Sequence, residues 1–186
     1  AAAFPLRVPR GFITRMEPGN PSDPLLRQVL PLDAENMSLA GFTTDPVGDR
    51  SASTPPGLLH KYRGRVLLAI TGACAVNCRY CFRRHFPYSE ENPADHDWYE
   101  ALTYLQKHEE VSEVILSGGD PLAYDDRRLA GLAQRLADIP HLKTLRIHSR
   151  LPVVLPERVN KALLAWMKGN RLQPVVVVHV NHPAEL

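Results

Sequence analysis

The chain has 186 residues, of which 44% are hydrophobic and 23% charged, the balance of an ordinary globular protein. Its 22 lysines and arginines nearly balance its 20 aspartates and glutamates, which argues against a nucleic-acid-binding protein. No apolar run is long enough to span a bilayer, and the composition also excludes collagenous, disulfide-rich and disordered classes.

Residues 1–60 are expected to form a proline-rich N-terminal arm. Nine of the 17 prolines of the chain lie in this stretch. Because proline fixes the backbone and removes a hydrogen-bond donor, we predict an irregular wrapping segment and not an independent domain. The one helix predicted here is short, from Ser22 to Leu30, with Pro24 in its first turn.

Residues 61–186 alternate between short apolar runs and amphipathic stretches. We predict strands at 66–70, 114–116, 145–147 and 175–178, and helices at 97–108, 125–139 and 156–168. The runs 66–70 and 175–178 show no polar alternation, which predicts strands covered on both faces. The order of elements predicts an α/β core domain of about four βα units, with parallel strands and right-handed crossovers.

A polar cluster follows each predicted strand. Ligands of parallel sheets bind at the carboxyl ends of the strands, so these clusters predict an active site at one end of the sheet. In chain order the clusters begin at Thr71, Ser117, His148 and His179.

All three cysteines fall within eight residues, as Cys74-x3-Cys78-x2-Cys81. Three thiolates can hold a [4Fe-4S] cluster and leave one iron open to a small molecule that carries amino and carboxylate groups. The alternative is a binding module stabilised by a closed Cys3His zinc site that includes His85, and chance clustering of buried cysteines is a third reading. The tight spacing favours iron over zinc, and an odd number of clustered cysteines indicates a reducing, cytoplasmic compartment.

This cysteine spacing, with Tyr80 before the last cysteine, resembles that of the radical S-adenosylmethionine superfamily. The segments 57–62, 78–84, 116–122, 146–154 and 181–183 are similar to those of lysine 2,3-aminomutases. The segments 12–16 and 83–88 most resemble the bacterial branch that makes (R)-β-lysine for modification of elongation factor P. The resemblance implies a partial radical SAM (β/α) barrel behind the arm.

The resemblance also implies an isomerase that converts L-α-lysine into (R)-β-lysine. In that family a reduced cluster splits S-adenosylmethionine, the resulting 5′-deoxyadenosyl radical takes a hydrogen from C3 of lysine, and the amino group moves from C2 to C3 while held by pyridoxal 5′-phosphate. The resemblance implies an electron donor such as flavodoxin or ferredoxin as a partner. It implies no binding to nucleic acid or to a membrane. A radical enzyme that acts on glutamate is the alternative within the superfamily.

The resemblance assigns a role to each matching residue. Arg83 is implied to pair with the substrate carboxylate, for which its planar fork is suited. The cluster ligands are Cys74, Cys78 and Cys81; S-adenosylmethionine and cofactor contacts come from Ser117, Gly118, Gly119, Asp120, His179 and Asn181; and pyridoxal phosphate is bound by His60, Lys61, Tyr62 and Arg65. His148, Ser149, Arg150 and His182 are further polar residues at these strand ends.

Each assignment has a plainer alternative. Gly118 and Gly119 can be needed only for a tight turn, Arg83 can be a solvated surface residue, and residues 60–65 can be a basic turn before a strand. Lys61 stands where the family more often has arginine, which keeps the charge but loses the fork.

The family's lysine tether for pyridoxal phosphate, and its acidic residues for the substrate's ε-ammonium group, match no position here and are implied to lie beyond residue 186. The first residue is alanine and not methionine. We therefore expect an N-terminal fragment, inactive alone, that exposes the edge of its last strand.

Overall fold

The computed structural model of the protein describes residues 4–37, 39–89 and 98–186. One five-stranded sheet forms its centre, in the order β1-β2-β3-β4-β5. The strands are β1 Leu58–Tyr62, β2 Arg65–Thr71, β3 Glu113–Gly118, β4 Thr144–Ser149 and β5 Gln173–Val178. The last four are parallel, and β1 pairs antiparallel with β2. The sheet is open, so the expected α/β class and partial barrel are confirmed.

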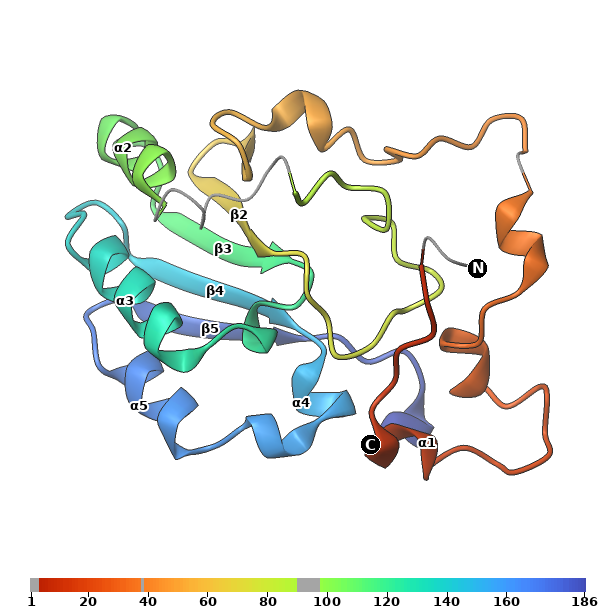
Figure 1. Ribbon diagram of the computed structural model, residues 1–186. Coiled ribbons are helices and arrows are strands. Elements are labelled where there is room, and N and C mark those ends of the chain that lie inside the picture. Colours follow the sequence, from red (N-terminus) through yellow and green to blue (C-terminus); the bar gives the residue numbers. More distant parts are fainter. Residues whose placement is uncertain (1–3, 38, 90–97) are drawn as a thin grey trace.

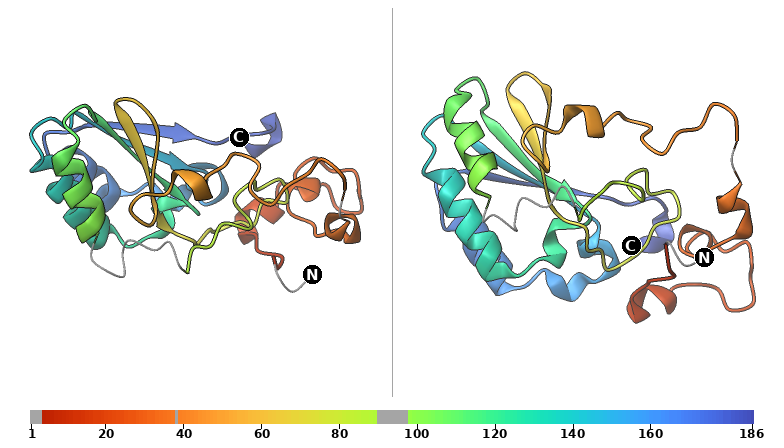
Figure 2. Two further views of the ribbon diagram at one scale, coloured as in Figure 1. Left: turned by 90° about the horizontal axis from the view of Figure 1, so that it is seen from above. Right: turned by 45° about the horizontal axis from the view of Figure 1, so that its top comes forward.

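Three helices lie along one face of this sheet (Figures 1 and 2). They are α2 Tyr99–Lys107, α3 Asp126–Ala137 and α5 Lys161–Lys168. The helix predicted at 97–108 is present, although Asp97 lies outside the described residues. The helix predicted at 156–168 is split into a 3-10 turn at Pro156–Arg158 and α5, because the Asn160 side chain accepts a hydrogen bond from the backbone N–H of Leu163 and so starts a new helix.

The two faces of the sheet differ in polarity because side chains alternate along each strand. Leu145 and Ile147 of β4 are buried in the core beneath the helices. Arg146 and His148 of the same strand are only partly buried and lie on the opposite, open face. The open face therefore carries polar side chains into the region where the strands end.

The arm crosses the carboxyl ends of the strands (Figure 2). As expected it is irregular: the predicted helix at 22–30 is reduced to one 3-10 turn, Leu26–Gln28. A second apolar cluster fixes the arm to the sheet domain, and it consists of Phe12, Leu25, Val29, Val76 and Val154. The arm's other short turns are α1 Arg10–Ile13, Asp33–Asn36 and Arg50–Ala52, and those of the sheet domain are Pro121–Ala123, α4 Leu151–Val154 and Pro183–Glu185.

Two local expectations are corrected. No strand is predicted before residue 66, yet β1 is present and lies across the expected boundary at residue 60; a turn at Gly64, with φ of +85°, folds it back onto β2. The run 175–178 is not covered on both faces, because β5 is the edge strand and Val176 and Val178 are 37% and 43% exposed. Within the described residues, none of the helices has the length and apolar character that a membrane span requires.

Candidate functional site

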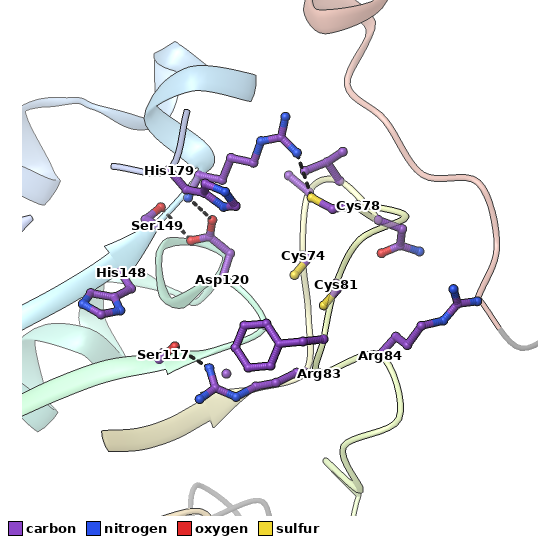
Figure 3. A pocket seen from close by; sticks show the side chains of 18 of the residues that line it. Cys74, Cys78, Cys81, Arg83, Arg84, Ser117, Asp120, His148, Ser149 and His179 are labelled. Atoms are coloured by element: carbon purple, nitrogen blue, oxygen red, sulfur yellow. Dashed lines mark hydrogen bonds between the residues drawn. The ribbon is translucent and has the colours of Figure 1, made fainter. Parts of the chain in front are cut away.

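A pocket of about 680 Å³ lies at the carboxyl ends of the parallel strands. Figure 3 shows side chains from the loop after β2 and from the turns after β3, β4 and β5 converging on it. This confirms the expectation that the polar clusters meet at one end of the sheet. The predicted residues that line the pocket are Cys74, Cys78, Cys81, Arg83, Ser117, Gly118, Gly119, Asp120, His148, Ser149, Arg150 and His179.

The three cysteines are free thiols on one irregular loop (Figure 3). Burial raises the pKa of Cys74 to about 12 and also raises the pKa of Cys81, so metal binding must displace protons from these thiols. Among the described side chains, no three His, Cys, Asp or Glu residues are placed to hold a single metal ion. His85 is exposed and does not line the pocket. The closed Cys3His arrangement is therefore not formed, whereas in a four-iron cluster each cysteine binds a separate iron.

The turn after β3 packs directly on the cysteine loop through its backbone. The N–H of Gly119 donates to the carbonyl of Thr71 at 2.6 Å, and the N–H of Asp120 donates to the carbonyl of Ala73 at 2.8 Å. Gly118 has φ of +113°, and a Cβ atom at Gly119 would lie only 2.8 Å from the carbonyl carbon of Gly72. Both glycines are therefore required for the backbone, because they let the turn after β3 pack against the cysteine loop at the edge of the pocket.

Asp120 ties the turns after β3 and β4 together. Its carboxylate accepts hydrogen bonds from the Ser149 hydroxyl at 2.7 Å and from the backbone N–H of Arg150 at 2.8 Å. Burial raises the pKa of Asp120, while these hydrogen bonds act in the opposite direction. This carboxylate therefore orders the rim of the pocket.

Arg83 enters the pocket and is held at two points. Its Nη1 donates to the Ser117 hydroxyl at 3.1 Å, as Figure 3 shows, and its Nε donates to the carboxylate of Asp49 at 2.7 Å. Asp49 is 3% exposed and also forms an ion pair with Lys61. Burial raises the pKa of Asp49, but hydrogen bonds from Lys61 and Arg83 outweigh burial and leave that pKa below its ordinary value. Asp49 thus contacts both Arg83, which the resemblance assigns to the substrate carboxylate, and Lys61, which it assigns to pyridoxal phosphate.

The other residues expected at pyridoxal phosphate lie away from the pocket. The hairpin between β1 and β2 places Tyr62 beside Arg65, at the amino end of β2, and Tyr62 is 68% exposed. Arg65 lies 3.4 Å from Glu113. The ring of His60 contacts the Tyr104 hydroxyl at 2.7 Å, over α2.

The three residues predicted after β5, which are His179, Asn181 and His182, contact different parts of the structure. His179 lines the pocket, and its Nε2 lies 2.9 Å from the side-chain oxygen of Asn181. The amide nitrogen of Asn181 donates to Gln28 at 3.1 Å and so contacts the arm. His182 instead caps the final turn through the backbone N–H of Ala184.

Sequence reasoning missed three buried polar residues around the site. They are Gln28, Asp49 and Glu185, which are 8%, 3% and 1% exposed. Asp49 and Glu185 come from segments without helical or strand periodicity. Gln28 lies in the helix predicted at 22–30, which is reduced to one 3-10 turn, so no local pattern marks its burial either. Some of their contacts join distant positions: Gln28 contacts Glu185, 157 residues away, and Asp49 contacts Arg83, 34 residues away.

Comparison with known proteins gives one family and a set of curated relatives. The Radical SAM superfamily model matches residues 68–185. A protein of Haemophilus influenzae named L-lysine 2,3-aminomutase is 51% identical over 98% of this chain and 54% of its own length. Proteins of the same name from Escherichia coli and Clostridium subterminale are 54% and 36% identical, over 98% and 94% of this chain and 53% and 42% of their own lengths. The chain thus spans about half the length of the curated relatives it matches.

Proposed function

This chain belongs to the radical SAM superfamily, and on that premise we propose that the whole protein is a lysine 2,3-aminomutase that converts L-α-lysine into (R)-β-lysine. The observation that carries the proposal is the convergence of three free cysteines, a glycine turn and Arg83 on one pocket. The relatives named L-lysine 2,3-aminomutase support the choice of substrate, because they match nearly all of the chain.

The residues around the pocket suit the superfamily's cofactors. Cys74, Cys78 and Cys81 provide three sulfur donors on one loop, the number that leaves one iron of a [4Fe-4S] cluster open. The adjoining pocket has the size of a small-molecule site, and Gly118 and Gly119 line it. When bound, the cluster and S-adenosylmethionine supply the radical chemistry, and pyridoxal phosphate holds the migrating amino group.

We assign Arg83 to the substrate carboxylate. Among the described residues its Nε donates to Asp49 and its Nη1 donates to Ser117, which leaves Nη2 and the second hydrogen of Nη1 for a ligand. These two donors are the end of the guanidinium that matches a carboxylate bidentately. Because Asp49 and Ser117 hold the side chain from two sides, Arg83 would orient the substrate without moving itself.

The remaining roles belong to the proposal for the whole protein. Ser117, Gly118, Gly119 and His179 would contact S-adenosylmethionine from the pocket wall, and Asp120 would order that wall. Tyr62 and Arg65 lie at the amino end of β2, away from the pocket, so we assign no cofactor contact to them. We further propose flavodoxin or ferredoxin as the electron donor, the cytoplasm as the compartment, and supply of β-lysine to elongation factor P as the purpose.

The test is product analysis with the whole protein after anaerobic reconstitution with iron and sulfide. L-lysine, S-adenosylmethionine, pyridoxal phosphate and dithionite are added, and β-lysine is measured by mass spectrometry. We expect β-lysine from the protein with all three cysteines and none from Cys78→Ala, which lacks one ligand. Conversion of glutamate but not lysine would overturn the substrate assignment, and absence of any amino migration in an iron-loaded protein would overturn the proposed function.

A further inference from the structure

Arg150 is a buried arginine that contacts one of the three cysteines. It lies at the junction of β4 and α4 and is 5% exposed. Its Nη1 lies 2.8 Å from the Sγ atom of Cys78, a contact drawn as a dashed line at Cys78 in Figure 3, and 2.6 Å from the Tyr80 hydroxyl. A guanidinium is always charged, so it presents a permanent positive charge to this sulfur.

The opposite edge of the same guanidinium faces a carboxylate. Its Nη2 donates to the Gln28 side-chain oxygen at 2.5 Å and to Glu185 Oε1 at 3.1 Å. Glu185 is 1% exposed, and its second oxygen, like Nε of Arg150, is buried with no hydrogen-bond partner among the described residues. The charge of Arg150 is therefore shared between a cysteine sulfur on one side and one incompletely paired carboxylate on the other.

Charge near a cluster sulfur affects reduction. A hydrogen bond or a cation at a ligating sulfur stabilises the reduced cluster, which carries one more electron, and so raises the reduction potential. An anion at the same distance has the opposite effect. Arg150 and Glu185 are an opposed pair of this kind, and both are too buried for solvent to screen them.

We propose that Arg150 is a positioning residue for the cluster: it donates to the Cys78 sulfur, fixes that ligand and makes the cluster easier to reduce, while Glu185 limits this effect. The proposal rests on the proposed function, because it requires a cluster on Cys78. It assigns a role to an arginine that supplies no metal ligand.

The test is the reduction potential of the reconstituted cluster, followed by electron paramagnetic resonance during redox titration. Arg150→Met keeps the apolar stem and removes the donors and the charge. It should lower the equilibrium constant for reduction at least tenfold, which is about 59 mV toward negative potential for one electron. Glu185→Gln should shift the potential the other way. Arg158→Met is the matched control, since it removes the charge of a partly buried arginine that pairs with Asp126 and, among the described residues, contacts no cysteine.

The proposal is supported if the reduction potential falls in Arg150→Met, rises in Glu185→Gln and is unchanged in the control. A general loosening of the structure would not move the potential in opposite directions in the two variants. An iron-loaded Arg150→Met protein with the wild-type potential would overturn it. If Arg150→Met fails to load iron, the reduction potential of Glu185→Gln tests the proposal instead. A potential of Glu185→Gln that is equal to or more negative than that of the wild type overturns the proposal. A wild-type protein that binds no iron would refute the proposed function as well.

Discussion

Replacing Gly119 by alanine should damage the site through the backbone alone. A Cβ atom at this position would lie 2.8 Å from the carbonyl carbon of Gly72 and closer still to the carbonyl oxygen of Ala73. Ordinary van der Waals contact begins at 3.4 Å, so the two backbone segments would have to separate by more than half an ångström. The segment that must move leads directly into Cys74.

The magnitude follows from this geometry. Overpacking of a closely packed contact costs about 1–3 kcal/mol, and each kcal/mol shifts Tm by about 2–4 °C in a chain of this length. Gly119→Ala should therefore lower Tm by about 2–12 °C. It should also reduce the iron and sulfide bound per chain, because displacement of Cys74 disturbs one of three ligands.

Gly131→Ala is the matched control for this change. Gly131 lies inside α3, and a Cβ atom there would contact nothing within 4 Å. Alanine in a helix interior is favoured over glycine by about 1 kcal/mol, so this variant should gain about 2–4 °C and load iron normally. Thermal unfolding followed by circular dichroism, with iron analysis on the same samples, makes the comparison. A Gly119→Ala protein with wild-type Tm and iron content would refute the inferred contact between the two loops.

Three further predictions concern charged side chains. In the whole protein, if it has the proposed activity, Arg83→Lys should reduce β-lysine formation roughly a hundredfold while iron content is unchanged, since a point donor misplaces the carboxylate by about 1 Å; near-normal kinetics would remove Arg83 from the site. In the same whole protein, Asp49→Asn should lower Tm and raise KM for lysine, because a hydrogen bond between charged groups is worth about 1.5–3 kcal/mol; an unchanged Tm and KM would contradict this. The hydrogen bond from Arg79 holds the pKa of Glu35 at about 2, below its ordinary 4.5, so the stability from this carboxylate is complete above pH 4.5 and is lost as pH falls toward 2. Glu35→Gln should therefore lower Tm at pH 7 but not at pH 2, and an equal loss at both values would rule out the charge as the cause.

The sequence predicts those parts of the site that lie directly after a predicted strand, because the same relation between strand end and polar residue recurs along the chain. Ser117, His148 and His179 each follow an apolar run, and parallel strands bring their carboxyl ends to one edge. That rule was enough to expect one pocket, and all three residues line it.

The residues that escaped prediction are placed by long-range contacts. Asp49 reaches Arg83 from an irregular arm, and Glu185 reaches Arg150 from the last turn of the chain. Their burial and pairing arise only when the arm folds across the strand ends. A polar residue in a proline-rich stretch looks the same in sequence whether it is solvated or buried against an arginine.

The fold departs from expectation where neighbours decide the outcome. The apolar run at 175–178 predicts a doubly covered strand, yet β5 has one neighbouring strand and a largely exposed face. In β1, Leu58 and Leu59 are buried, but the residues that follow them are basic and polar and show little local preference for a strand, so no strand is predicted here. Pairing with β2 overrides that local preference.

The central claim is that Cys74, Cys78 and Cys81 hold one four-iron cluster with an iron open to S-adenosylmethionine. The most direct measurement is the electron paramagnetic resonance spectrum of the anaerobically reconstituted and reduced protein, with and without S-adenosylmethionine. We expect about four irons and four sulfides per chain, and a spectrum that changes when S-adenosylmethionine is added. A colourless protein with one zinc per chain, or a cluster whose spectrum is unchanged at saturating S-adenosylmethionine, would contradict the claim.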